Sequence, residues 1–300
     1  MNPAPVDLTG RVAVVTGGGK GIGRAIAEGL AARGAAVVVN NRCRDGHDPA
    51  SEVVEAITRA GGTAVADDTV VGAEGSGERL VAHARAAFGG LDLVVSNAAV
   101  VDRALFARSD PDRFRQVLDI DFWGAVDLTR AALDDIVERR GRILYVTSSA
   151  GLYGEAGVAS YAAAKGALIA FARSLAAEVA RHGVRVNLLA PFAATAMTAG
   201  HVPPGLEDRL APEFVVPAAL WLLGDDVPLN GAVVVAAANR FRLALTGETT
   251  GLRFDGDTPV APERLAAHVD ELTAPDGWRP FADATSAFLD LVGLAPPSTP

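Results

Sequence analysis

Short apolar runs alternate with helix-forming stretches along most of the chain, and this alternation strongly restricts the possible folds. The first run, 11–15, is followed by the glycine-rich segment 16–23 and then by helical apolar spacing to about Arg33. A second apolar run, 35–39, completes a βαβ unit. Because continuous apolar runs are typical of strands buried on both faces, we expect a parallel sheet covered by helices on both sides.

The alternation continues as far as Ala237. Seven strands are predicted, at 11–15, 35–39, 63–66, 91–96, 142–147, 184–189 and 232–237. Asp48-Pro49 and Ser109-Asp110-Pro111 are helix-start signals, and the second opens a long helix to about Arg139. Further helices are predicted at 76–88, 160–181 and 213–223. Right-handed crossovers between such strands give an α/β fold, a Rossmann-like doubly wound seven-stranded parallel sheet with helices on both faces.

The stretch 240–300 follows the last predicted strand. It shows helical apolar spacing at 264–272 and 282–292. A stretch of this length is too short for a substantial core of its own. We therefore expect one dinucleotide-binding and catalytic domain, 1–239, with a C-terminal helical extension, 240–300, that packs on this domain or on a second subunit.

Composition narrows the class of protein. The formal net charge of −9 and the isoelectric point of about 5.1 argue against nucleic acid or a membrane surface as partner. The single cysteine, Cys43, excludes an intramolecular disulfide and fits a reducing compartment. No apolar run is long enough to span a membrane, and no secretion signal is evident. The five histidines lack metal-ligand spacing. We expect a cytoplasmic protein that binds a small molecule and no metal.

The glycine-rich segment lies between a predicted strand and a predicted helix. In this context Gly17, Gly21 and Gly23 would let the backbone approach a pyrophosphate held at the helix N-terminus. Lys20 and Ile22 belong to the same turn. A glycine cluster can also be only a tight turn, but the strand–turn–helix context favours dinucleotide binding.

Tyr161 and Lys165 are four residues apart in a predicted helix, so their side chains project from one face. A phenol ordinarily has a pKa of about 10, too high for proton transfer at neutral pH, and a close ammonium favours the phenolate. Such a pair suits general acid–base chemistry, with Ser148 as a hydrogen-bond partner of the same oxygen. The same spacing also occurs at ordinary core edges, and Ser148 could be an ordinary strand-end serine.

Taken in this order, three motifs resemble the short-chain dehydrogenase/reductase family: Thr16-Gly17-x-x-x-Gly21-x-Gly23, Ser148 and Tyr161-x-x-x-Lys165. The resemblance covers roughly 8–238. It is nearest to the hydroxysteroid and (3R)-hydroxyacyl-CoA dehydrogenase-like members, through the strand end 37–40, the segment 191–198 and the extended tail.

The resemblance implies further site residues. Asn97 lies in a match to the family's Asn-Ala-Gly segment and would stabilise the central sheet beside the cofactor. Asp68 falls where family members contact adenine. Pro191 and Thr195 lie in the match to the segment that binds the nicotinamide carboxamide.

Three departures from the family pattern affect the expected pocket. Asp121 occupies the place of the Asn of the family's catalytic tetrad, which puts the usual proton relay in question. Phe192 replaces a glycine after Pro191, and 236–238 replaces a glycine-rich strand end. The alternative for Asp121 is a solvated helix residue. For Phe192 we expect a packing role, with a place in the wall of the substrate cavity as the alternative.

The end of the second predicted strand indicates the cofactor. Dinucleotide folds that prefer NAD place an acidic residue here to accept hydrogen bonds from the ribose. This chain has Asn41 and Arg42, and no carboxylate until Asp45. Arg42, with Lys20 or Arg44, would meet the 2′-phosphate of NADP(H), so we expect NADP(H) rather than NAD(H). The alternative is that Arg42 is a solvated loop cation.

The resemblance therefore implies an NADP(H)-dependent oxidoreductase that interconverts a ketone and a secondary alcohol on an apolar small molecule, a ketoreductase of secondary metabolism being one such role. Tyr161 would transfer the proton, Ser148 would polarise the carbonyl, and Lys165 would favour the phenolate and bind the nicotinamide ribose. The segment 199–209 is the expected substrate lid.

Assembly and two alternative functions complete these expectations. Relatives form dimers or tetramers through helices that correspond to 111–139 and 160–181, so a homodimer or homotetramer is expected. The first alternative is a nucleotide-binding protein without redox turnover, with a regulatory or scaffolding role. The second is a family member with non-redox chemistry. Intact Ser148, Tyr161 and Lys165 weigh against both alternatives, and Asp121 keeps them open.

Overall fold

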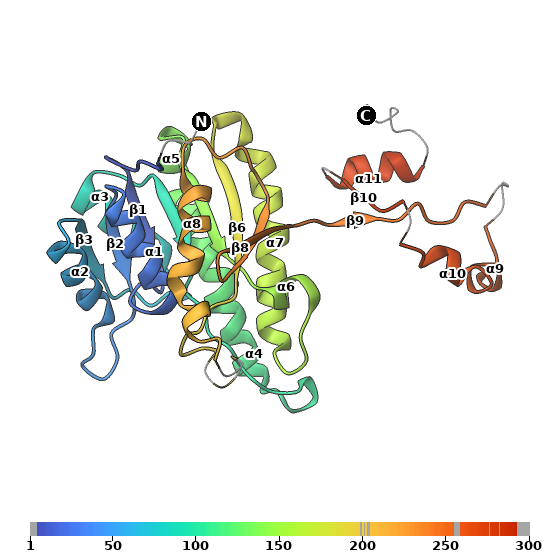
Figure 1. Cartoon of the computed structure of the whole chain (residues 1–300), viewed down its shortest axis with the longest axis horizontal. Coiled ribbons are helices and arrows are strands. Elements are labelled where there is room, and N and C mark those ends of the chain that lie inside the picture. Colours follow the sequence, from blue (N-terminus) through green and yellow to red (C-terminus); the bar gives the residue numbers. More distant parts are fainter. Residues whose placement is uncertain are drawn as a thin grey trace. The chain divides into compact units, whose positions relative to one another are not determined.

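The computed structural model describes residues 5–198, 200, 202, 205–254, 259–275, 277–281 and 283–292. The chain divides into two compact units, Met1–Leu243 and Ala244–Pro300 (Figure 1). Whether the expected extension packs on the rest of the chain stays a prediction.

The first unit is built on an eight-stranded sheet of order β3-β2-β1-β4-β5-β6-β7-β8. Its strands are β1 Val12–Val15, β2 Ala36–Asn40, β3 Thr63–Asp67, β4 Leu93–Ser96, β5 Arg142–Val146, β6 Arg185–Pro191, β7 Val233–Ala237 and β8 Arg240–Ala244. The first seven strands pair in parallel, which confirms the predicted fold class. The strand order reverses between β1 and β4, the place where doubly wound sheets bind ligands at their carboxyl ends.

Helices cover both faces of this sheet, as predicted (Figure 1). One layer holds α1 Gly21–Ala32, α2 Pro49–Arg59 and α8 Val216–Leu223, and the other holds α3 Ser76–Phe88, α5 Gly124–Glu138 and α7 Ala159–Val179. The valines of β1 and β2 are almost fully buried, because each strand lies between the two helical layers. This burial explains why continuous apolar runs predicted these strands.

The eighth strand, β8, was not predicted. After β7 the chain reverses through Ala238 and Asn239, whose φ angles of 48° and 59° are those of a two-residue hairpin turn. The first four residues of β8 are exposed, so the strand lacks the apolar run that marks the others. The sheet is therefore one strand wider than the seven expected.

The helix predicted at 111–139 is divided by a π-helical turn. The structure has α4 Pro111–Leu118, a π-helical turn Asp119–Trp123, and then α5. Asp110 caps α4 by accepting a hydrogen bond from the backbone of Asp112 at 2.9 Å. A π turn inserts one residue into the helical repeat and is frequent at functional sites. Here it carries Asp121, the residue that departs from the family pattern.

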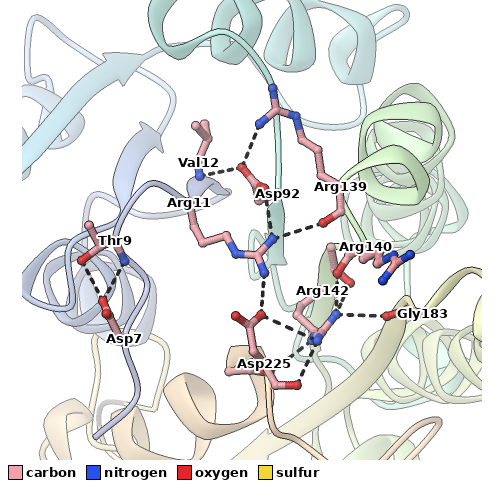
Figure 2. Close-up of polar contacts among 12 residues, drawn as sticks. Asp7, Thr9, Arg11, Val12, Asp92, Arg139, Arg140, Arg142, Gly183 and Asp225 are labelled. Atoms are coloured by element: carbon pink, nitrogen blue, oxygen red, sulfur yellow. Dashed lines mark hydrogen bonds and ion pairs between the residues drawn. The ribbon is translucent and has the colours of Figure 1, made fainter.

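A network of charged side chains holds the amino ends of the strands together (Figure 2). The Asp92 carboxylate accepts a hydrogen bond from the backbone N–H of Val12 at 2.9 Å and pairs with Arg11 at 3.2 Å. Arg11 also pairs with Asp225 at 2.6 Å, and the buried Arg142 donates to the Asp225 carbonyl at 3.1 Å. These contacts join the amino ends of β1, β4 and β5, which lie opposite to the strand ends that carry the glycine-rich turn.

Short elements complete the described chain. In the first unit these are α6 Ser149–Tyr153 and the 3₁₀ turns Phe106–Arg108, Ala180–His182, Asp208–Leu210 and Pro212–Val215. In the second unit β9 Gly247–Glu248 pairs antiparallel with β10 Arg279–Pro280, and three helices follow the predicted apolar stretches, α9 Pro262–Ala266, α10 Val269–Leu272 and α11 Ala284–Leu291. Within the described residues, no helix has the length and apolar character needed to cross a membrane.

Candidate active site

A cavity of about 550 Å³ opens where β1, β4, β5 and β6 end. Most of the residues predicted from the sequence line it: Gly17, Lys20, Gly21, Ile22, Gly23, Asn41, Arg42, Asn97, Ser148, Tyr161, Lys165, Pro191 and Thr195. The topology brings them together because the carboxyl ends of parallel strands meet at one edge of the sheet. Asp68 and Asp121 are the two predicted site residues that do not line the cavity.

The glycine turn leaves a cradle at the start of α1 that side chains would fill. A Cβ at Gly23 would lie 2.2 Å from the Gly17 carbonyl oxygen and 2.5 Å from Asn97 Nδ2. Gly17 also has a φ of 62°, which favours glycine. Among the described residues no side chain caps α1 at Lys20, so the first N–H groups of the helix face the cavity end of the turn. This cradle fits the pyrophosphate of a dinucleotide.

Asn97 joins the glycine turn to β4. Its Nδ2 donates to the carbonyl oxygens of Thr16 at 3.0 Å and Gly17 at 3.2 Å. In return, the Thr16 hydroxyl oxygen accepts from the backbone of Asn97 at 3.0 Å and of Ala98 at 3.1 Å. These four hydrogen bonds fix the two strand ends at the point where the sheet reverses its order.

Two cationic side chains lie at the end of the cavity where the adenosine ribose of a dinucleotide would bind. Lys20 and Arg42 line it, and the described lining residues include a single carboxylate, Glu155, in the loop after α6. At the end of β3, Asp67 is engaged with Asn40 Nδ2 at 2.8 Å and with His83 at 2.8 Å. Burial raises the pKa of Asp67, but these hydrogen bonds outweigh burial and lower it. The Asp67 carboxylate is therefore already satisfied, and it does not line the cavity.

Two predicted cofactor contacts lie outside this lining. Asp68 is exposed, and its neighbours Thr69 and Val70 line the cavity instead. Arg44 pairs with Asp45 at 3.6 Å on an exposed turn. Of the cations considered for a 2′-phosphate, Arg42 and Lys20 are thus the two that face the cavity.

Lys165 is held at the end of β5. Its side chain is 2% exposed, and Nζ donates to the Val146 carbonyl at 3.1 Å. Nζ also lies 5.5 Å from the centre of the Tyr161 ring, as expected for positions four apart on α7. The Thr147 hydroxyl donates to the Lys165 carbonyl at 2.9 Å, which fixes this turn of α7 against the strand.

Ser148 starts α6. Its Oγ accepts a hydrogen bond from the backbone N–H of Ala150 at 3.1 Å, so the side chain has a fixed position. A hydroxyl that accepts one hydrogen bond can still donate its own hydrogen. Because Ser148 lines the cavity, that hydrogen is available to a carbonyl oxygen in the cavity.

Asp121 lies behind Lys165 in the interior. The residue is 1% exposed, so the alternative of a solvated helix residue is wrong. Oδ1 accepts from the backbone N–H of Val100 at 2.8 Å, and Oδ2 lies 3.5 Å from Lys165 Nζ. Oδ2 is buried without a hydrogen-bond partner in the described structure. Burial raises the pKa of Asp121, while the Lys165 charge and the Val100 N–H oppose that rise.

The other end of the cavity is mainly apolar, and no sequence motif marks it. Val101, Val158, Phe192, Met197 and Leu210 line this end. Phe192 is 47% exposed, which suits a cavity wall better than the packing role considered from the sequence. Within the expected lid, 199–209, positions 199, 201, 203 and 204 lie outside the described residues. These lining residues come from loops whose positions depend on tertiary structure, so only their apolar character was visible in the sequence.

Comparisons with known proteins agree with this geometry. Residues 11–203 match the family model described as short chain dehydrogenase. The peroxisomal multifunctional enzyme type 2 of Mus musculus is 34% identical over 95% of this chain and 38% of its own length. A hydroxyacyl-CoA dehydrogenase of Mycobacterium tuberculosis is 38% identical over 76% of this chain and 78% of its own.

A solved structure of a short chain dehydrogenase from Mycobacterium avium has a TM-score of 0.80 to this chain at 35% identity, covering 91% of this chain and 97% of that one. The chain spans 30–38% of the length of three curated peroxisomal relatives that it matches, those of Neurospora crassa, Mus musculus and Saccharomyces cerevisiae.

The Lys165–Asp121 pair generates a prediction about Tyr161. A buried carboxylate offsets the ammonium charge that favours the Tyr161 phenolate. In the variant Asp121→Asn we therefore expect the phenolate to form at lower pH than in the wild type. The chain has three tyrosines, and burial raises the pKa of Tyr145, so ¹³C-labelled tyrosine resolves the titration by NMR.

Asp119→Asn is the matched control, because Asp119 lies on the same π turn but is exposed. It should leave the titration of Tyr161 unchanged. In a pH–rate profile where Tyr161 acts as the acid, Asp121→Asn should move the alkaline limb to lower pH. An unchanged titration and an unchanged limb would show that Asp121 does not act on Tyr161.

Proposed function

The chain belongs to the short-chain dehydrogenase/reductase family, and from this membership we propose that it is an NADP(H)-dependent oxidoreductase that interconverts a ketone and a secondary alcohol on an apolar small molecule. The membership itself makes the chain an NAD(P)-dependent oxidoreductase acting on hydroxyl or keto groups. It also confirms the family resemblance predicted from the sequence, with hydroxyacyl-CoA dehydrogenases among the relatives.

One observation carries the proposal. Ser148, Tyr161 and Lys165 line the same cavity as the glycine cradle of α1. A nucleotide held at the cradle and a substrate beside Tyr161 would then share one enclosed space. The apolar far end of this cavity supports an apolar substrate.

The residues of the chain divide the chemistry among them. A bound nicotinamide cofactor supplies the hydride in reduction or accepts it in oxidation. The Ser148 hydroxyl donates a hydrogen bond to the substrate oxygen and so polarises the carbonyl. Tyr161 donates its phenolic proton to the same oxygen as the alcohol forms. The Lys165 ammonium, fixed by Val146 and Asp121, stabilises the charge that remains on the phenol oxygen.

We infer that Asp121 favours reduction of a ketone over oxidation of an alcohol. Its carboxylate partly offsets the ammonium charge of Lys165, which is the charge that would favour a phenolate on Tyr161. A protonated phenol is the form needed to donate a proton to a ketone, whereas oxidation of an alcohol needs the phenolate as base. The proposed role is therefore that of a ketoreductase.

The names of the relatives support a substrate class. One is a hydroxyacyl-CoA dehydrogenase and another a 3-oxoacyl-[acyl-carrier-protein] reductase. We therefore infer that the ketone lies on an acyl chain held as a thioester. A role in secondary metabolism and a cytoplasmic location stay predictions.

Cofactor preference is tested by titrating both reduced cofactors. Arg42 and Lys20 would contact the 2′-phosphate, so NADPH should bind about tenfold more tightly than NADH or better. Arg42→Gln should remove most of this preference. Arg44→Gln is the matched control, because Arg44 does not line the cavity, and it should keep the preference. Tighter binding of NADH by the wild type would contradict the proposal.

Removing the transferable proton tests the chemistry. Tyr161→Phe keeps the ring, so reduction of a candidate ketone should slow by about two to four orders of magnitude while cofactor affinity is kept. Tyr153→Phe is the control, because Tyr153 is 78% exposed and does not line the cavity. Near-normal turnover in Tyr161→Phe would refute the catalytic assignment.

The outer face of α7 supports the expected assembly into a dimer or tetramer. Ala163, Ala170 and Ala177 are exposed along this helix, and small side chains let two helices approach closely. We expect light scattering to give a dimer or tetramer at micromolar concentration, and Ala170→Arg to lower the mass. Ala60→Arg, at the end of α2, should leave the mass unchanged. A monomeric wild type would contradict this assembly.

A further inference from the structure

A second cavity, of about 370 Å³, lies beside the β7–β8 hairpin and has no role in the chemistry above. Its wall is formed by the hairpin, by Phe192 and by the segment around the 3₁₀ turn Asp208–Leu210. The lining residues are apolar except for three arginines, Arg209, Arg240 and Arg242.

Three arginines and no carboxylate are among the residues that line this cavity. None of the three arginines has an ion-pair partner within the described part of the chain. All three are exposed, so their guanidinium groups can reach a ligand. The chain has 36 acidic and 27 basic residues, so a group of unpaired cations departs from its general charge. An acidic protein that gathers cations at one cavity indicates an anionic ligand there.

The hairpin places two of these arginines in the wall of the cavity. Successive side chains of a strand alternate between its faces, so Arg240 and Arg242 share one face of β8 and Phe241 occupies the other. The two-residue turn at Ala238 and Asn239 pairs Arg240 with Ala237 and Arg242 with Val235. These partners on β7 are small, and both line the same cavity.

The second cavity adjoins the candidate active site. Phe192 and Leu210 line both cavities, so these two side chains form the shared wall. A long ligand can therefore place its ketone beside Tyr161, run past the apolar wall, and end among the arginines. An acyl thioester has this order of groups when its carrier bears phosphate.

We propose that Arg209, Arg240 and Arg242 bind a phosphate of the pantetheine carrier that holds the acyl substrate. Guanidinium groups suit this task because they donate paired hydrogen bonds to phosphate oxygens. The proposal rests on the proposed function, since it concerns the carrier end of the same thioester. Coenzyme A and the phosphopantetheine arm of a carrier protein share this chemistry.

The carrier preference is tested with the same 3-oxoacyl group attached to coenzyme A, to a carrier protein and to N-acetylcysteamine. The wild type should have a kcat/KM at least about tenfold higher for the coenzyme A thioester than for the N-acetylcysteamine thioester, which has no phosphate. Arg240→Gln/Arg242→Gln should remove this difference and leave the N-acetylcysteamine reaction unchanged, which also shows that the variant is folded. Arg59→Gln, an exposed cation on α2, is the control that should keep the difference.

A loss confined to the carrier-protein thioester would identify the carrier protein as the source of the phosphate. Equal kcat/KM on all three carriers in the wild type would overturn the proposal and leave the ketone reduction standing. Equal losses on every carrier in the double variant would also overturn it.

Binding gives a second readout that does not require turnover. Calorimetry with coenzyme A, in the presence of saturating NADP⁺ so that the nucleotide cradle is occupied, should detect binding to the wild type and at least tenfold weaker binding to Arg240→Gln/Arg242→Gln. Equal binding by both would overturn the arginine site. Binding without reduction of any ketone would contradict the proposed function and support the site, so the two failures are distinguishable.

Discussion

The buried contact between Lys165 and Asp121 is the interaction on which the site depends. Both side chains are buried, and Oδ2 of Asp121, which has no hydrogen-bond partner in the described structure, lies 3.5 Å from the ammonium. Removing one partner of such a pair leaves a buried charge uncompensated, at a cost of about 3–5 kcal/mol. The π-helical turn carries Asp121 and places its carboxylate beside Lys165. The catalytic face of α7 is thus tied to the helix that precedes β5.

The interactions that hold the strands together lie at the amino ends of the strands, and the candidate catalytic side chains lie at their carboxyl ends. At the amino edge, Arg11, Asp92 and Asp225 join three strands and the end of α8 through ion pairs and backbone contacts (Figure 2). At the carboxyl ends, hydrogen bonds between Asn97 and Thr16 join the glycine turn to the end of β4, and Ser148 and Tyr161 line the cavity beside them. A rigid amino edge lets the loops at the other edge vary without loss of the sheet.

Most of the strands and the glycine turn could be predicted, because buried positions require apolar or small residues that are visible in the sequence. The seven parallel strands could be recognised as apolar runs. The glycine motif could be recognised because the fold requires glycine at Gly23, where a Cβ would collide with Gly17. The strand β8 was missed because its first four residues are exposed and form no apolar run. The π turn was missed because the stretch 111–139 was predicted as one continuous helix. The sequence likewise could not show that Asp121 is buried, or that Arg240 and Arg209 line the same cavity, because both facts depend on tertiary contacts.

The central claim is that this chain reduces a ketone rather than binding a nucleotide passively or catalysing a non-redox step. The most direct test incubates the full chain with NADPH and a 3-oxoacyl thioester and measures both nucleotide oxidation and product. The account predicts one equivalent of secondary alcohol for each equivalent of NADPH oxidised. Nucleotide binding without oxidation, or conversion of the substrate without NADPH consumption, would contradict it.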